Sequence, residues 1–181
     1  LLGAGMNLGV IWRVGVHAAG YTAVSIAATL ALGLWWGRRA RLRGDVSLLV
    51  ATGTAICGGS AIAAIAGVVK PKPHDVTVAM TTVFLLNAVA LLIFPAIGHA
   101  LGFSPHQFGL WAALAVHDTS SVVGAALEYG GGAVGVATTV KLTRALWIVP
   151  VALAVSLWWP RGETAEDVHP GRPRRVRLPV P

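Results

Sequence analysis

Apolar residues along this chain occur in long blocks that are separated by short polar stretches. The apolar blocks cover residues 19–37, 45–69, 76–101, 108–127 and 133–159. A helix needs about 20 apolar residues to cross a hydrocarbon layer of about 30 Å, so these blocks are close to or above that length. In lipid only a helix or a closed barrel satisfies its own backbone hydrogen bonds, so such runs favour helices. With residues 1–10 as the tail of an earlier helix and residues 11–18 as a short linker, the pattern predicts five or six helical segments and no sheet.

The composition strengthens the membrane interpretation. The chain is 55% hydrophobic and 12% charged, whereas soluble domains carry about 25% charged residues. The net charge of +7 does not indicate nucleic-acid binding, because most cations gather in two clusters at the ends of apolar blocks. Clusters of this kind are typical of cytoplasmic loops. We therefore expect an all-α integral membrane protein, multi-pass in the cell inner membrane, with the lipid bilayer as partner and no nucleic acid. The clustered residues are Arg38, Arg39, Arg41 and Arg43, then Arg161, Arg172, Arg174, Arg175 and Arg177.

The chain divides into an apolar part and a polar end. Residues 1–159 are predicted to form a partial transmembrane transporter domain, and residues 160–181 a basic, truncated cytoplasmic loop. Both ends are expected to be cut from a longer protein. The arginine clusters place the ends of segments 19–37 and 133–159 on the same side of the membrane. Between those ends the chain could form four spanning segments, or two spanning and two re-entrant segments. Either arrangement returns the chain to the side from which it started. Residues 70–75, with two prolines, are predicted to be a plain loop, and the side on which that loop lies would separate the two schemes.

Glycine interrupts the second apolar block near its centre. Gly53, Gly58 and Gly59 each weaken a helix by about 1 kcal/mol relative to alanine, and Thr54 and Ser60 add hydroxyl groups there. Broken helices in secondary transporters point backbone N–H groups at anions. A ridge of small residues for tight helix packing would give a similar pattern. Both interpretations stay open for this segment alone.

A second polar interruption lies in the centre of the fourth block. It consists of His117, Asp118, Thr119, Ser120 and Ser121. Consecutive polar groups at membrane depth are expensive, and they favour a functional site over a buried structural one. The serines could cap a half-helix or donate to an oxyanion, and the histidine titrates near neutral pH. We expect the first two residues to carry a coupling proton.

Two cations lie in the middle of the last block. Lys141 is about 12 Å and Arg144 about 17 Å from its start, and each costs about 2.5–3.5 kcal/mol at that depth unless it faces a polar cavity or an anion. Their spacing of three puts them on one helix face. Asp118 could pair with one of them or carry a proton, and both interpretations stay open. As the acid expected at membrane depth, it leaves a balance of about +1 with His117 neutral, which favours an anion.

Other chemistry has weaker support. The single cysteine, Cys57, excludes an internal disulfide, and the histidines are too scattered for a zinc site. Adjacent His117 and Asp118 cannot align as a catalytic relay with Ser60, so we do not expect an enzyme. We also expect no metal or other cofactor. Asn87 is expected to make an interhelical hydrogen bond.

Several of these motifs together resemble a known family. Residues 52–64, 95–98, 108–109, 116–124 and 140–144 are similar, in the same order, to the YeiH-type sulfate exporter family, which is similar to cation/proton antiporters and bile-acid-type sodium symporters. The resemblance implies about ten helices in two inverted repeats, with two discontinuous helices that cross near the midplane. This chain would be the central half. It departs from the family at Ser121, where Gln or Val is usual, and so substrate identity is not carried over.

The sequence thus predicts a helical bundle with two discontinuous helices, part of an inverted-repeat fold, acting as a secondary transporter that exports or exchanges a small, sulfate-like oxyanion. The coupling ion, a proton or sodium, and a homo-oligomeric state are left open. The alternatives are a cation/proton antiporter that uses Asp118 and a non-transporting membrane scaffold. The predicted substrate-binding residues are Thr54, Gly58, Gly59, Ser60, Thr119, Ser120, Ser121, Lys141 and Arg144, and the predicted proton-coupling residues are His117 and Asp118.

Overall fold

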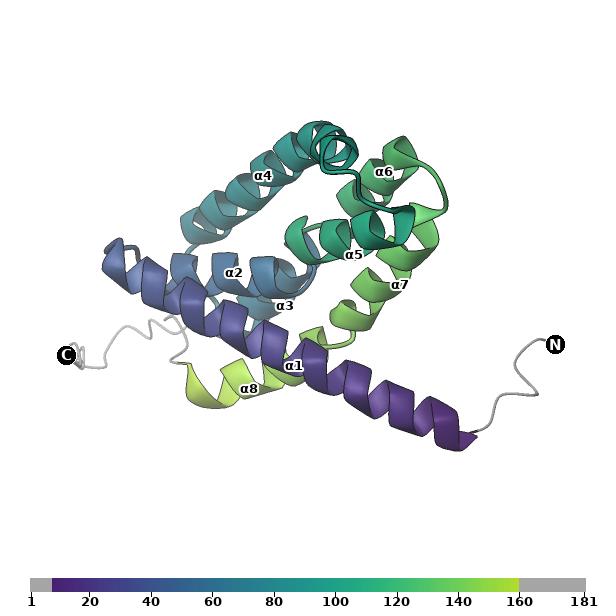
Figure 1. The fold of residues 1–181 in the computed structure, drawn as a ribbon. Helices are drawn as coiled ribbons and strands as arrows, with labels where there is room; N and C mark the ends of the chain where they lie inside the picture. Colours follow the sequence, from purple (N-terminus) through teal and green to yellow (C-terminus); the bar gives the residue numbers. More distant parts are fainter. Residues whose placement is uncertain (1–7, 160–181) are drawn as a thin grey trace, which may run out of the picture.

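The computed structural model describes residues 8–159, with side chains from residue 20 onward, and within this part every regular element is a helix (Figure 1). The all-helical prediction is confirmed for these residues. Predictions for residues 1–7 and 160–181 lie outside the described part. The helices are α1 (Leu8–Arg39), α2 (Gly44–Ala55), α3 (Gly59–Val69), α4 (Pro73–Ala100), α5 (Pro105–Ala115), α6 (Thr119–Tyr129), α7 (Ala133–Ala145) and α8 (Ile148–Trp158).

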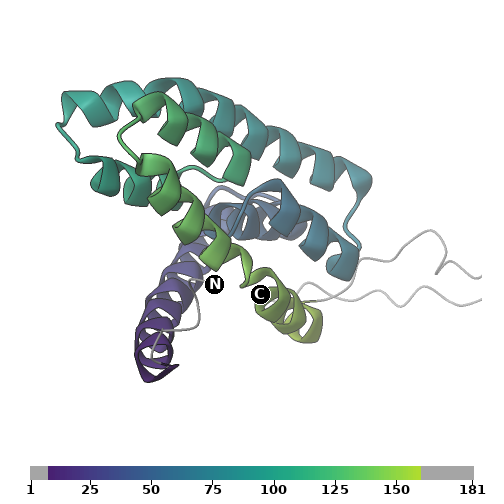
Figure 2. The same ribbon diagram turned by 90° about the vertical axis from the view of Figure 1, so that its right-hand side faces the viewer.

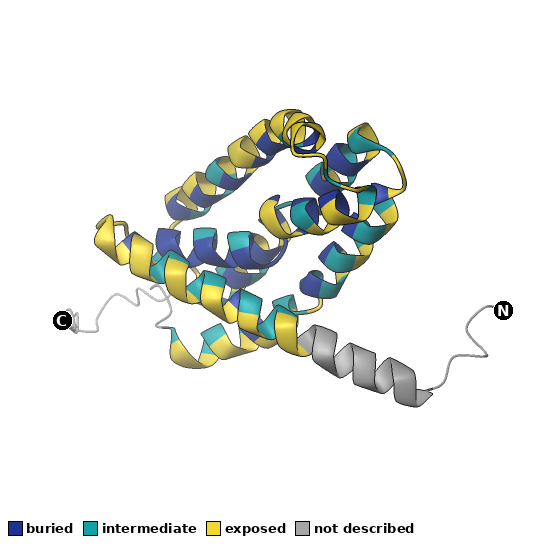
Figure 3. Cartoon of the chain, viewed as in Figure 1, coloured by how far each residue is buried: buried dark blue, intermediate teal, exposed yellow. Residues whose placement is uncertain are grey.

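Two apolar helical stretches in the described part are long enough to cross a membrane. One is α4 with 28 residues, and the other is the 26-residue stretch Ala133–Trp158 formed by α7 and α8. Figure 2 shows α8 continuing from α7 with a bend. Many large apolar side chains on the outer faces of α4 and α8 are exposed, whereas α2 is largely buried and α3 is partly buried (Figure 3). This distribution suits helices whose outer faces contact lipid.

Helices α2 and α3 form a hairpin. The chain turns over residues 56–58, where Gly58 has φ +67° and ψ −126°. A Cβ built on Gly53 in α2 would lie 2.9 Å from Cδ1 of Ile62 in α3, so the two helices fold back on each other. At the base of the hairpin, Arg43 pairs with Asp75 in the first turn of α4, with 3.2 Å between Nη2 and Oδ2. The start of α2 and the end of α3 therefore lie at the same end of the molecule.

Helices α5 and α6 form a second hairpin. Ser104 and Gln107 make a capping box that starts α5, and the chain turns over residues 116–118. Tyr129, the last residue of α6, donates its hydroxyl to the carbonyl of Phe103, just before α5. The Tyr129 ring also stacks on Phe108 with 3.9 Å between centroids. This base lies at the opposite end of α4 from the Arg43–Asp75 pair.

Each hairpin has its own apolar core. Buried residues of α2 and α3 pack with α1, α4 and α8, and those of α5 and α6 pack with α4 and α7. The second core uses many alanines, which let helices approach closely: a Cβ on Gly109 of α5 would lie 2.8 Å from the carbonyl oxygen of Ala133 in α7. The molecule thus holds two compact helical hairpins among longer helices.

Three predicted boundaries are wrong. Residues 11–18 were predicted to be a linker, but α1 runs through them, because they contain no proline and their one glycine, Gly15, weakens a helix without ending it. The predicted loop 70–75 is shorter, since α4 begins at Pro73, a favourable first helical residue. The last segment was predicted as one helix but is divided at Leu146 and Trp147.

Candidate functional site

The tips of the two hairpins touch through their backbones. A Cβ built on Gly58 would lie 3.3 Å from Cα and N of Asp118 and from the carbonyl carbon of His117. Gly58 is buried, and its positive φ is strained for any residue with a side chain. The sequence requires glycine here for two reasons, the turn and the close approach of the second tip.

Asn87 of α4 fixes the second tip. Its Oδ1 accepts hydrogen bonds from the backbone N–H groups of His117, at 2.9 Å, and Asp118, at 3.2 Å. Asn87 is buried, and its Nδ2 has no hydrogen-bond partner within the described residues. The predicted interhelical hydrogen bond thus reaches the connection between two helices, whose N–H groups would otherwise be orphaned.

Asp118 is the N-cap of α6. Its Oδ2 accepts from the backbone N–H groups of Ser120, at 3.0 Å, and Ser121, at 3.4 Å, and from the Ser120 hydroxyl. A carboxylate at this position satisfies the first amides and interacts favourably with the positive end of the helix. The serines therefore give their N–H groups to Asp118 and do not themselves cap α6. Thr119 and His117, on either side of Asp118, are half-buried.

Lys141 caps the end of α5. Its side chain is 1% exposed, and its Nζ donates to the carbonyl of Val116, at 2.7 Å, and to that of Ala113, at 3.4 Å. These carbonyls lie at the C-terminal end of α5, where the last carbonyl groups of a helix have no hydrogen-bond donor within the helix. The negative end of the helix dipole lies there too. The ammonium thus compensates the carbonyl end of the helix that enters the second tip.

Arg144 does the same for α2. It is 4% exposed, and its Nη2 donates to the carbonyl of Ala55, the last residue of α2. Its Nε is buried without a hydrogen-bond partner among the described residues. The predicted ion pair of Asp118 with Lys141 or Arg144 is wrong: the ion pair found within residues 20–159 joins Arg43 and Asp75. Asp118 instead serves the amides of α6.

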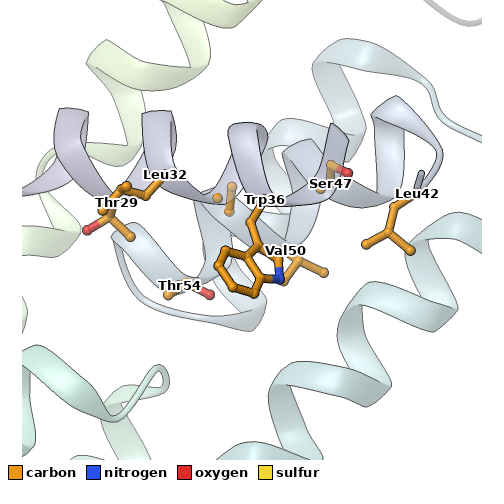
Figure 4. Close-up of a pocket in the computed structure, with 10 residues that line it drawn as sticks. Thr29, Leu32, Trp36, Leu42, Ser47, Val50 and Thr54 are labelled. Carbon is orange, nitrogen blue, oxygen red and sulfur yellow. The ribbon is translucent and has the colours of Figure 1, made fainter. Parts of the chain in front are cut away.

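At the first tip, Gly59 begins α3, and a Cβ on it would lie 3.0 Å from Cζ of Phe84. The Ser60 hydroxyl lies 3.0 Å from Sγ of Cys57 and donates to its carbonyl at 3.2 Å. Thr54 lies apart from the other predicted residues, since its side chain lines a cavity between α1 and α2 (Figure 4). The structure therefore gathers most of the predicted residues around the two tips and the adjacent face of α7.

A second cavity, of about 220 Å³, lies beside Arg144. It lies between α1, α5 and α7, and its volume is below the roughly 300 Å³ of pockets for drug-sized ligands. The sequence interpretation missed its α1 residues, although their hydroxyl groups recur at helical spacing. The lining residues are Tyr21, Thr22, Ser25, Leu114, Val140 and Arg144.

Two further residues were missed. Asp75 was assigned to a plain loop but is fully buried, and Tyr129 closes the second hairpin. An acid in the first turn of a helix that starts with proline was the available signal for Asp75. Within residues 20–159, no three His, Cys, Asp or Glu side chains are grouped to hold a metal ion.

Comparison with known proteins gives one family. The model of the family described as conserved hypothetical protein 698 matches residues 1–180. The chain is 57% identical over 165 residues to a UPF0324 membrane protein of Bdellovibrio bacteriovorus, covering 91% of this chain and 51% of that protein. It is 54% identical over 156 residues to a UPF0324 membrane protein of Bacteroides thetaiotaomicron, covering 86% and 47%. The chain spans about half the length of these curated relatives. No solved structure matches it.

Proposed function

We propose that this chain, which belongs to the conserved hypothetical protein 698 family and is similar to UPF0324 membrane proteins, forms part of a secondary transporter. The proposed transporter moves a small oxyanion across the cell inner membrane without covalent chemistry. The observation that carries the proposal is the contact between the two hairpin tips beside two buried cations, Lys141 and Arg144. Sulfate is the first substrate to test, because of the sequence resemblance described above.

The proposed membrane orientation follows from the ends of the hairpins. We place the arginines at the end of α1 in the cytoplasm, with α1, α4 and the α7–α8 stretch as spanning segments. The bases of the hairpins lie at opposite ends of α4, so the hairpins would enter as re-entrant segments from opposite faces. Together α2–α3 and α5–α6 would be the discontinuous segments of a multi-pass, inverted-repeat transporter. Non-helical backbone at membrane depth is tolerated where protein buries it or where it lines a water-filled cavity.

The charges around the tips favour an anion. Each hairpin brings one carbonyl end and one N–H end of a helix to its tip, and these partial charges largely cancel. The lysine and arginine side chains then outweigh Asp118 by about one positive charge when His117 is neutral. An oxyanion would compensate this excess. Further N–H and hydroxyl donors would come from Gly59 and Ser60 at the start of α3.

The cavity beside Arg144 is the proposed entrance to this site. It is lined by Arg144 on one side and by hydroxyl-bearing residues of α1, such as Ser25, on the other. Its small volume suits a small ion. Arg144 also holds the carbonyl of Ala55 at the first tip, so an anion that draws its guanidinium away would loosen that hairpin. Binding and tip movement would thereby be linked through one side chain.

Asp118 is the proposed coupling group, with His117 beside it. The carboxylate caps α6, and protonation would remove its negative charge while leaving an oxygen that still accepts from the first amides of that helix. Proton binding would then raise the net positive charge beside the second tip, while anion binding acts on the first. The two tips are in contact at Gly58, which gives a direct route for coupling.

The test is transport by the complete gene product that contains this sequence, reconstituted in proteoliposomes. Labelled sulfate and other small oxyanions would be offered with and without a pH or sodium gradient. The proposal expects gradient-dependent uptake of at least one oxyanion and none in empty vesicles. Exchange of monovalent cations for protons without oxyanion flux would instead establish an antiporter that uses Asp118. No flux of either kind from folded protein would favour a scaffold.

A further inference from the structure

A groove runs along the contact between α1 and α2. The two helices touch at Gly33, where an added Cβ would lie 2.7 Å from Cβ of Ala51, and at Gly37, where it would meet Ser47. Beside this contact is a cavity of about 390 Å³ (Figure 4). Its walls are mainly apolar, and they include Thr29, Leu32, Trp36, Leu42, Val50 and Thr54.

Along α2 the groove is shorter than the hydrocarbon depth of one lipid leaflet. From Ser47 to Thr54 along α2 is about 10 Å at 1.5 Å per residue, against about 15 Å for half of the hydrocarbon layer. Its outer edge is formed by Leu32, 64% exposed, and Trp36, 68% exposed, so the groove opens to the outside of the described part. An extended hydrocarbon chain would fit this shape.

One end of the groove is strongly basic. Leu42 lines it there, between Arg41 and Arg43, and Arg38 and Arg39 lie in the last turn of α1. All four arginines are exposed. Arg43 pairs with Asp75, and the other three form no ion pair with residues 20–159. Exposed cations next to a transmembrane helix attract anionic lipid headgroups.

A buried hydroxyl lies between the basic end and the apolar walls. Ser47, in the first turns of α2, lines the cavity, and its Oγ is buried without a hydrogen-bond partner among the described residues. In a phospholipid the ester groups lie between the phosphate and the acyl chains. If the Ser47 side chain turned from the α1 contact toward the cavity, an ester carbonyl at that level would accept the hydroxyl proton and remove the cost of an unsatisfied buried donor.

We propose that this groove binds one anionic phospholipid, with an acyl chain along α1 and α2 and its phosphate over Arg38, Arg39 and Arg41. The charge of the arginines selects the headgroup, the apolar walls hold the chain, and Ser47 binds an ester. The inference does not depend on the transport proposal. The lipid would cover the α1–α2 contact and anchor the first hairpin at its base.

The headgroup is tested by lipid titration of the detergent-purified complete gene product, followed by native mass spectrometry. Phosphatidylglycerol should bind more tightly than phosphatidylcholine. The double variant Arg38→Gln, Arg41→Gln should weaken phosphatidylglycerol binding roughly 30-fold, from about 1 kcal/mol per cation. The control, Lys70→Gln with Lys72→Gln, removes the same charge from the same end of the molecule and should change it little. Equal binding of both lipids, or equal effects of the two double variants, would overturn the proposal.

The groove is tested by filling it. Leu32→Trp puts a larger side chain into the cavity, and Leu92→Trp makes the same change at an exposed position of α4. The first variant should lower retention of phosphatidylglycerol several-fold and the second should not. Melting temperatures of both variants show that they are folded. Unchanged lipid retention in folded Leu32→Trp would mean that another part of the protein covers the groove, and the proposal would fail.

Discussion

Gly58 offers the sharpest test of the contact between the hairpins. Its φ of +67° and ψ of −126° belong to a region that side chains disfavour, and an alanine Cβ would lie 3.3 Å from the backbone of His117 and Asp118. Backbone atoms cannot move aside as the end of a flexible side chain can. Gly58→Ala must therefore either strain the first tip or separate the two tips.

The size of the effect follows from the conformation and a matched control. Holding a residue with a side chain in such a region costs about 1–3 kcal/mol, before the tight contacts are included. Gly67→Ala, in α3 of the same hairpin, is the control, because its Cβ would meet nothing within 4 Å. There alanine should stabilise the helix by about 1 kcal/mol. The two variants should thus differ by about 2–4 kcal/mol in free energy of unfolding.

The assay is reversible unfolding of the complete gene product by sodium dodecyl sulfate in mixed micelles, measured for wild type and both variants. Gly58→Ala should unfold at a lower detergent fraction than wild type, and Gly67→Ala at an equal or higher one. If the two variants unfold at the same detergent fraction, the tips do not meet at Gly58, and the geometry of the proposed site is incorrect.

Three further changes test how the tips are held. Asn87→Ala leaves the N–H groups of His117 and Asp118 without an acceptor. The free energy of unfolding should fall by about 1–3 kcal/mol for each lost hydrogen bond, and amide hydrogen exchange in residues 112–121 should become faster. Unchanged exchange would refute this. Lys141→Met leaves the carbonyls at the end of α5 without a cation and should lower the free energy of unfolding by about 2–4 kcal/mol, whereas Lys141→Arg should lose less; equal losses would show that the charge is not what matters. Asp118→Asn keeps a good N-cap, so stability should change by less than about 1 kcal/mol, but uptake driven by a pH gradient should be lost; a variant with normal pH dependence would exclude Asp118 as the coupling group.

The sequence was sufficient to predict the helices. Blocks of apolar residues gave the approximate positions of the helices, because length and hydropathy reflect local properties of the chain; five or six segments were predicted, and residues 8–159 form eight helices, since three of the blocks are divided. The same pattern placed Lys141 and Arg144 in an apolar setting, and both are buried. Boundaries were less accurate where polar residues lie inside a helix, as in residues 11–18, because such residues weaken the apolar pattern without breaking the helix.

Partners could not be predicted, because they depend on how distant segments meet. The sequence offered Asp118 as partner for Lys141, but the ammonium binds carbonyl oxygens of α5, a group that every residue carries and no motif marks. The direction of the chain at Gly58 was also open, since a glycine permits a straight break or a reversal. Asp75 was missed for the same reason: its partner, Arg43, is distant in sequence.

Equilibrium binding of the best-transported oxyanion tests the central claim most directly. Labelled anion would be bound to the purified complete gene product with Arg144 intact, with Arg144→Gln, and with the exposed Arg38→Gln as a control for charge. The account predicts saturable binding that Arg144→Gln lowers at least tenfold, in protein that remains folded, and that Arg38→Gln leaves unchanged. Binding that is equal in all three proteins would contradict an anion site at the hairpin tips.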